Sequence, residues 1–196
     1  MLKLLALLAS ITIFIAPATA AAPVKARVPG GIGILLIHAG TAEKTAPLVI
    51  FREPSLGRVA EIDAGQLPSL SQSVSSPEGV IPVIVTVKKS GWYRIIYDDS
   101  EREGWIEGSS SQQFNRWEEL LRDRTVSLIG GLRKEFYLLR RIPDISAEGI
   151  SPLGKGSRVT ALVADGDWIK VSTDSLPEGW IRWRDENGRL VIALNL

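Results

Sequence analysis

The sequence predicts an all-β protein made of two small barrels in tandem, joined by a short α-helix. Short β-branched or aliphatic runs alternate with polar turns along most of the 196 residues. A strand that opens with Trp and is followed by Gly-Trp-Ile occurs twice, at Trp92 with 104–106 and at Trp168 with 179–181. A repeat of this kind indicates two copies of one structural unit. Only residues 110–124, between the copies, have a helical pattern.

Residues 1–20 have the pattern of a secretory signal peptide. Lys3 precedes an apolar run over 4–15, and Ala18-Thr19-Ala20 forms an Ala-x-Ala cleavage site. We therefore expect a periplasmic or secreted protein, cleaved near Ala20, with a tether over 21–32. The alternative is an uncleaved segment that anchors the chain in a membrane.

Composition excludes several classes of protein. Without residues 1–20, which contain Lys3 and no acid, the 23 Lys and Arg become 22 and equal the 22 Asp and Glu. Since nucleic-acid-binding proteins carry a basic excess, we expect no nucleic-acid partner. The chain has no Cys, so disulfide frameworks and thiol catalysis are excluded.

Besides the strands of the two Trp hairpins, six strands are expected from local pattern, three in each copy, and they are separated by polar loops. The first copy also has a Ser-, Pro- and Gln-rich insert over 64–79, whose polar composition predicts a mobile surface loop. The expected strands are 32–38, 48–51 and 80–87 in the first copy, and 125–129, 136–139 and 158–163 in the second.

A helical connector is expected over 109–124. Ser110 and Gln113 fit a capping box, and an apolar stripe containing Phe114 and Trp117 continues through 120–121. We expect this stripe to pack the helix between or against the two barrels. The alternative is a face that binds a partner.

The repeated motif resembles the bacterial SH3-like domains of exported proteins. In that family an early strand ends in an Arg-containing loop, and a Trp strand leads to a Gly-Trp-Val or Gly-Trp-Ile strand. The resemblance implies SH3-like domains over 33–108 and 125–196, with Arg52 and Arg140 in corresponding loops. Both loops depart from the family's usual Asn-Val-Arg-Ser-Gly-Pro pattern, so the type of ligand does not transfer.

Strand alternation predicts which way the Trp side chains point. If the cations Arg94 and Lys170 reach water, then Tyr93, Ile95, Ile169 and Val171 point inward and the Trp residues lie on the outer face. Ile106 and Ile181 are the expected core residues of the partner strands. Each barrel would then show one cross-strand Trp pair, namely Trp92 with Trp105 and Trp168 with Trp180.

The two Trp pairs have two interpretations. They either stabilise the hairpins by cross-strand contact or form an aromatic platform for a ligand. The second interpretation gives eight candidate ligand-binding residues: Trp92, Arg94, Trp105, Trp168, Lys170, Trp180, Arg52 and Arg140.

The sequence offers no catalytic or metal-ligating constellation. His38 is the only His, so neither a Ser-His-Asp triad nor a His-rich metal site can be assembled. The glycines at 30, 31 and 33 lack the Lys-Ser/Thr of a phosphate loop, and the acidic segment 98–103 is typical of a turn rather than of a calcium site. We therefore expect no cofactor, no metal and no enzymatic activity.

These observations favour a non-catalytic exported binding module that recognises a peptide, peptidoglycan or an envelope protein through its tandem domains. The alternative is a structural protein whose barrels pack into a larger envelope complex. A single fused hydrophobic interface that contains Trp117, with little exposed aromatic surface, would favour the alternative.

Overall fold

The computed structural model describes residues 29–38, 47–70 and 72–196. The predicted signal peptide and most of the predicted tether lie outside these residues. The first half contains the strands β1 (Gly33–His38), β2 (Leu48–Glu53), β3 (Leu56–Ile62), β4 (Val74–Ser75), β5 (Val80–Lys89), β6 (Trp92–Ile96), β7 (Glu103–Glu107) and β8 (Gln112–Arg116), with a 3-10 helix at Ala64–Gln66. The helix α1 (Trp117–Leu121) leads to β9 (Thr125–Leu128), a 3-10 helix at Lys134–Tyr137, β10 (Leu138–Arg140), β11 (Gly149–Pro152), β12 (Arg158–Asp165), β13 (Trp168–Ser172), β14 (Gly179–Arg182) and β15 (Ile192–Asn195).

The strands form two sheets of the same order, which confirms the all-β class. One sheet runs β3-β2-β7-β6-β5-β1-β8, and the other runs β11-β10-β14-β13-β12-β9-β15, with β4 added at its end. The long hairpin strands β5 and β12 also carry a register irregularity at equivalent places, between Val85 and Val87 and between Ala161 and Val163. The repeat seen in the sequence is thus a repeat of topology. The hydrogen bonds close neither sheet into a barrel among the described residues, so the barrels stay a prediction.

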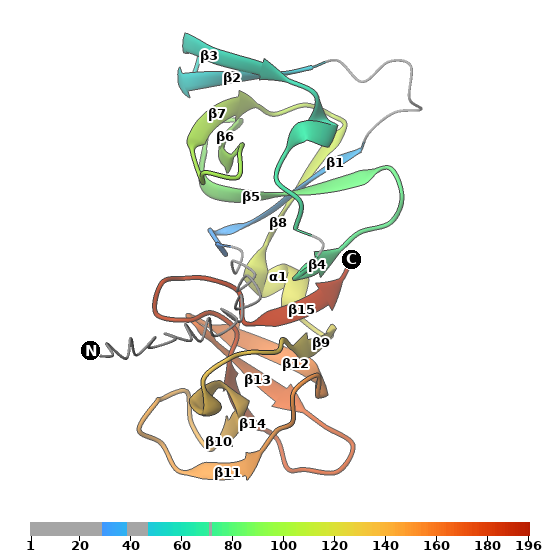
Figure 1. The fold of residues 1–196 in the computed structure, drawn as a ribbon, viewed down its shortest axis with the longest axis vertical. Coiled ribbons are helices and arrows are strands. Elements are labelled where there is room, and N and C mark those ends of the chain that lie inside the picture. Colours follow the sequence, from blue (N-terminus) through green and yellow to red (C-terminus); the bar gives the residue numbers. More distant parts are fainter. Residues whose placement is uncertain (1–28, 39–46, 71) are drawn as a thin grey trace, which may run out of the picture.

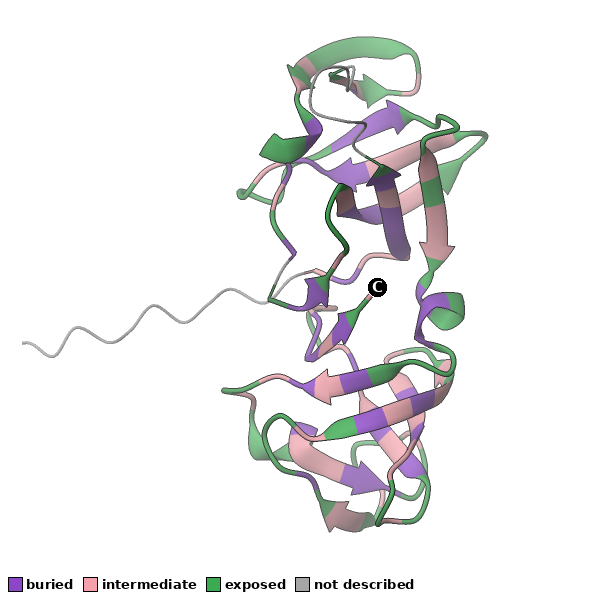
Figure 2. Cartoon of the chain, turned by 90° about the vertical axis from the view of Figure 1, so that its right-hand side faces the viewer, coloured by how far each residue is buried: buried purple, intermediate pink, exposed green. Residues whose placement is uncertain are grey.

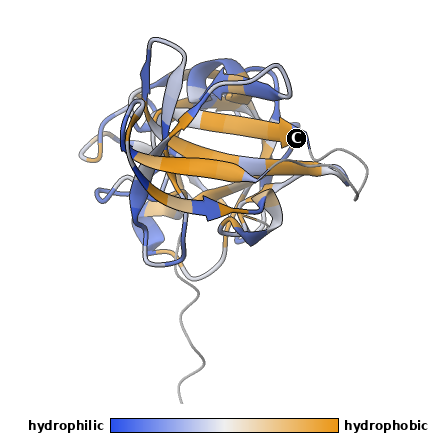
Figure 3. Cartoon of the chain, turned by 90° about the horizontal axis from the view of Figure 1, so that it is seen from above, coloured by the Kyte–Doolittle hydropathy of each residue, from blue (hydrophilic) through white to orange (hydrophobic). Residues whose placement is uncertain are grey.

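Side-chain alternation along the Trp hairpins follows the predicted pattern. Ile95 and Ile106 in the first half and Ile169, Val171 and Ile181 in the second are all buried. Figure 2 shows buried stretches on strands in both halves of the molecule and exposed stretches in many of the loops. In Figure 3, which shows the molecule from above, hydrophobic strands cross the centre of the molecule.

The predicted helix over 110–124 is wrong over its first half. Residues 112–116 form β8, which pairs with β1, and only Trp117–Leu121 is helical. Phe114 therefore does not continue the helical stripe; its ring packs against Tyr93, with the ring centroids 5.6 Å apart. Gly33 permits the close pairing, because a Cβ there would lie 2.3 Å from the carbonyl oxygen of Asn115.

Trp117 lies in a hydrophobic core that the two halves share. It is 1% exposed, and its ring centroid is 5.2 Å from that of Trp183. Its indole N–H donates a hydrogen bond to the carbonyl of Gly30. The same core joins Ile84 and Ile96 of the first half to residues of the second half. The prediction that Trp117 packs the connector against its neighbours is confirmed, and α1 lies at the waist of the molecule in Figure 1.

The insert over 64–79 is a strap between the halves, so the prediction of a mobile surface loop is wrong in its described part. Leu67, Leu70 and Val74 are buried, and β4 pairs in parallel with β15 of the other sheet. The backbone N–H of Leu194 donates to the carbonyl of Ser73 at 2.9 Å. A few apolar residues at irregular spacing are enough to hold this segment, which has no periodic pattern for sequence reasoning to detect.

Candidate functional site

The predicted ligand residues of the first half share one face of β6 and β7, but their pairing differs from the expectation. Arg94 stands opposite Trp105, and Trp92 stands opposite Glu107. The Trp92 ring meets Phe51 edge-on, at a centroid distance of 5.5 Å. Trp92 and Trp105, predicted as a cross-strand pair, are therefore diagonal neighbours rather than directly opposite residues.

Trp105 is too well covered to serve as a platform. It is 7% exposed, and the guanidinium carbon of Arg94 lies 5.9 Å from the centre of its ring. Arg94 is itself held by Glu103, at 3.0 Å between Nε and Oε2. The strand β2 pairs with β7 at Trp105. The outward exposure predicted for this Trp is wrong, since β2 comes from a distant part of the chain and its pairing is not a local property.

The predicted residues of the second half form a more open face. Lys170 stands opposite Trp180, and Trp168 opposite Arg182, so Trp168 and Trp180 are also diagonal rather than directly opposite neighbours. Both Trp side chains are half-buried. Lys170 makes an ion pair of 2.6 Å with Glu178, while Arg182 lies over the Trp168 ring at 5.8 Å.

Arg52 and Arg140 do not occupy equivalent positions. The residue that pairs with Trp105 is Phe51, whereas the residue that pairs with Trp180 is Arg140. Phe51 therefore takes the place of Arg140 in the first half, one residue away from the expected Arg52. Arg52 is exposed and follows Phe51 on the opposite face of its strand. The structure brings Trp168, Lys170, Trp180 and Arg140 together on one face, but separates Arg52 from Trp92, Arg94 and Trp105.

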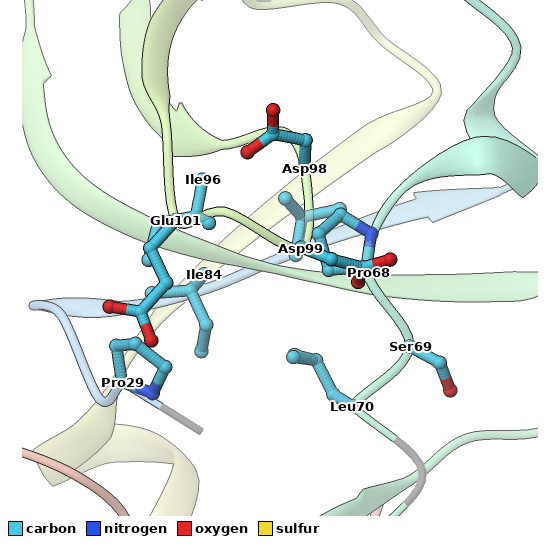
Figure 4. Close-up of a pocket in the computed structure, with 10 residues that line it drawn as sticks. Pro29, Pro68, Ser69, Leu70, Ile84, Ile96, Asp98, Asp99 and Glu101 are labelled. Carbon is cyan, nitrogen blue, oxygen red and sulfur yellow. The ribbon is translucent and has the colours of Figure 1, made fainter. Parts of the chain in front are cut away.

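A cavity that the sequence pattern did not indicate is lined by residues of the first half and of the strap, and Glu101 at its edge pairs with Arg189 of the second half. We call it the junction cavity. It has a volume of about 130 Å³, and the apolar side chains of Leu70, Val83, Ile84 and Ile96 contribute to its lining. In Figure 4, Leu70 and Ile84 point into the space enclosed by the lining segments, and Glu101 lies beside Pro29. These residues come from four separate stretches of chain, so no sequence motif could have indicated them.

Three carboxylates line the cavity, and they differ in their partners. Asp98 accepts backbone N–H groups of Arg102 and Ser100, at 2.9 and 3.1 Å. The pKa of Asp98 is lowered, chiefly by the backbone hydrogen bond from Arg102 and also by the Arg102 guanidinium, and the pKa of Arg102 is raised in return. Asp98 thus organises a turn, as the sequence analysis expected of this segment.

The other two carboxylates give the rim an unbalanced negative charge. Glu101 forms an ion pair with Arg189 of the second half, at 2.7 Å. Asp99 is exposed and makes no ion pair with any residue that the structure describes. The cavity therefore combines an apolar floor with one uncompensated carboxylate at its edge.

Two further features bear on chemistry. Among residues 29–38, 47–70 and 72–196, no three His, Cys, Asp or Glu side chains are placed to hold a metal ion. His38 lies exposed at the end of β1. No helix in this described part of the chain is long and apolar enough to span a membrane.

Comparison with known proteins gives a weak structural likeness and no family. No family model and no curated protein matches the chain. Among solved structures, the chain is similar to NlpC1 from Trichomonas vaginalis, with 9% identity and a TM-score of 0.32. The match covers 89% of this chain and 52% of NlpC1, so the chain spans about half the length of that protein.

The expectation that the chain is not an enzyme is corrected by this finding. NlpC1 is an NlpC/P60-family protein, and the exclusion of enzymatic activity is not carried further. At this TM-score and identity, the likeness assigns neither an activity nor a family to the chain.

Proposed function

We propose that the chain is an exported binding module in which two SH3-like units act as one body and hold a peptide segment at their junction. The peptide would belong to peptidoglycan or to an envelope protein. The SH3-like assignment is supported by the repeated Trp hairpins and by the matching strand order of the two sheets. Because the halves share a core and a strap, the junction has a fixed shape.

The junction cavity is the observation that carries this proposal. Its apolar floor suits a short aliphatic stem, and Asp99 at the edge suits a cationic group at the end of that stem. Lys, Arg and diamino-acid side chains have this form. The floor is built by strands rather than by loops alone, which holds Ile84 and Ile96 in place before a ligand arrives.

A retention assay with purified peptidoglycan tests the cell-wall form of the proposal. We expect residues 21–196 to be retained, and Asp99→Lys to reduce retention at least fivefold because the cation at the rim would repel the ligand. Asp174→Lys is the matched control, since it makes the same charge change at the corresponding exposed hairpin tip of the second half. Equal retention of the two variants would contradict the assignment to the cavity.

The same assay distinguishes the cavity from the Trp faces. Trp92→Ala and Trp168→Ala leave the lining of the cavity unchanged, so both should be retained like the wild type. Loss of retention in these variants alone would move the binding site to the sheet faces. If the wild type is not retained, the wall form of the proposal fails, and a Lys-containing peptide of an envelope protein becomes the ligand to titrate.

A second candidate function is structural. The fused core around Trp117 and the burial of Trp105 are the features that favour a protein whose halves pack into a larger envelope complex. This function predicts that the chain migrates in native gels of envelope extracts as part of a complex, and that Asp99→Lys does not change the size of that complex. Dissociation by Asp99→Lys would favour peptide binding at the cavity instead.

A further inference from the structure

Arg140, at the end of β10, is a buried cation with few partners. It is 6% exposed. Its Nη1 donates a hydrogen bond of 2.7 Å to the carbonyl of Ala147, and its Nε is buried without a hydrogen-bond partner. Nη2 makes no hydrogen bond to a described residue. The Nε–Nη2 edge of the guanidinium, which carries two parallel donors, therefore lacks acceptors.

No carboxylate of the described residues forms an ion pair with this cation. The ion pairs of the second half use other residues, and none of them includes Arg140. Asp144 follows closely in sequence, but it accepts the hydroxyl and the backbone N–H of Ser146, at 2.6 and 2.7 Å. These bonds, with a smaller effect of the Arg140 charge, lower the pKa of Asp144. A buried cation with no ion-pair partner and an unbonded Nε is costly, and such groups in native proteins call for an explanation.

The neighbours of Arg140 form a row suited to a ligand. Arg140 pairs with Trp180, Trp180 with Lys170, and Lys170 with Val163, so all four residues share one face. Val163 is 44% exposed, and Trp180 is half-buried with no cation over its ring among the described residues. The row thus offers, in order, a guanidinium, an open indole, the Lys170 side chain and an apolar side chain.

The first half has lost the same arrangement. Phe51 replaces Arg140, and Arg94, which corresponds to Lys170, covers the Trp105 ring. The two copies therefore differ at this face. In the first copy the face is covered, whereas in the second copy it is open and contains the buried guanidinium of Arg140. This divergence is specific to the face and leaves the strand order unchanged.

We propose that Arg140 and Trp180 form a binding site for a carboxylate that carries an apolar group. The carboxylate would accept two hydrogen bonds from the Nε–Nη2 edge of Arg140, and the apolar group would lie on Trp180, the cross-strand neighbour of Arg140. A single negative charge fits better than a phosphate dianion, because Lys170 is already paired with Glu178. The site is separate from the junction cavity and does not depend on the proposed function.

NMR titration of isotope-labelled residues 21–196 tests this site directly. The probe is N-acetyl-Leu-Leu as the free acid, and its C-terminal amide is the control. We expect the Arg140 Nε–H and Trp180 indole signals to shift saturably with the acid and to stay in place with the amide. N-acetyl-Leu-Glu-amide distinguishes a side-chain carboxylate from a chain terminus, and inorganic phosphate tests the choice of anion.

Two variants complete the test. Arg140→Lys keeps the charge but loses the two-donor edge, so it should weaken binding of the acid at least tenfold. Arg141→Met is the control, because Arg141 is exposed and pairs with Glu148; it should bind as the wild type does. Three results would each overturn the proposal: equal shifts with acid and amide in the wild type, tighter binding of phosphate than of the acid, or equal weakening by Arg141→Met. The titrations of the wild type decide the question even if Arg140→Lys fails to fold.

Discussion

Replacement of Trp117 by Ala should destabilise the whole molecule, because this residue joins the cores of both halves. A buried Trp removes roughly 150–250 Å² from water, and at about 25 cal/mol per Å² this corresponds to an upper bound of roughly 4–6 kcal/mol. Trp117 is 1% exposed, so nearly all of this area is lost. The variant also leaves the carbonyl of Gly30 without its indole donor. We expect a loss of about 4 kcal/mol in the free energy of unfolding, within the range of Trp→Ala core substitutions.

Urea denaturation of residues 21–196, followed by intrinsic fluorescence and circular dichroism, measures this loss. Trp180→Ala is the matched control, since it makes the same chemical change at a half-buried position and should cost about 1 kcal/mol. The reasoning would be refuted by a Trp117→Ala loss below about 2 kcal/mol, or by equal losses in the two variants. Either result would mean that packing of Trp117 in the shared core contributes little to the free energy of unfolding.

Three further predictions concern packing, the strap and pH. Gly104→Ala should lower the free energy of unfolding by about 1–3 kcal/mol, because a Cβ would lie 2.3 Å from Cγ2 of Ile50. Gly65→Ala is the control: a Cβ there would have no neighbour within 4 Å, so this variant should change stability little in the same urea denaturation experiment. Val74→Asp buries a charge in the strap and should speed proteolysis within 64–79, so a cleavage pattern like that of the wild type would count against the strap. Folding lowers the pKa of Asp98 from its ordinary value of 3.8, so the contribution of Asp98 to stability is present above about pH 4 and is lost as the pH falls further. The melting temperatures of the wild type and Asp98→Asn should therefore converge toward pH 2. A difference in melting temperature that stays constant with pH would contradict this.

The hairpins could be predicted from sequence because their signal is local. Alternation in Trp168-Ile169-Lys170-Val171 fixes which side chains share a face, and the structure has the expected core residues there. The exposure of the Trp side chains could not be predicted in the same way. Whether Trp105 is covered depends on the pairing of β7 with β2, some fifty residues earlier in the chain, and alternation contains no information about that neighbour.

Errors in the candidate site have a similar origin. A shift of one residue between Phe51 and Arg52 moves a side chain to the opposite face, so motif alignment alone misplaced the first Arg. The spacing of apolar residues over 110–124, including Trp117 and Leu121, is typical of a helix. Phe114 nevertheless lies in a strand, because residues 112–116 pair with β1. The junction cavity depends on four distant segments that only the folded chain brings together.

The central claim is that the chain binds a peptide at the junction of its halves. The most direct measurement is an NMR map of residues 21–196 titrated with soluble peptidoglycan fragments that carry their stem peptides. If the peptide binds there, the methyl signals of Leu70, Ile84 and Ile96 shift together with the amide of Asp99, and Asp99→Lys abolishes these shifts. Shifts confined to the Trp faces of the two sheets, or no saturable shift at the four cavity residues, would contradict it.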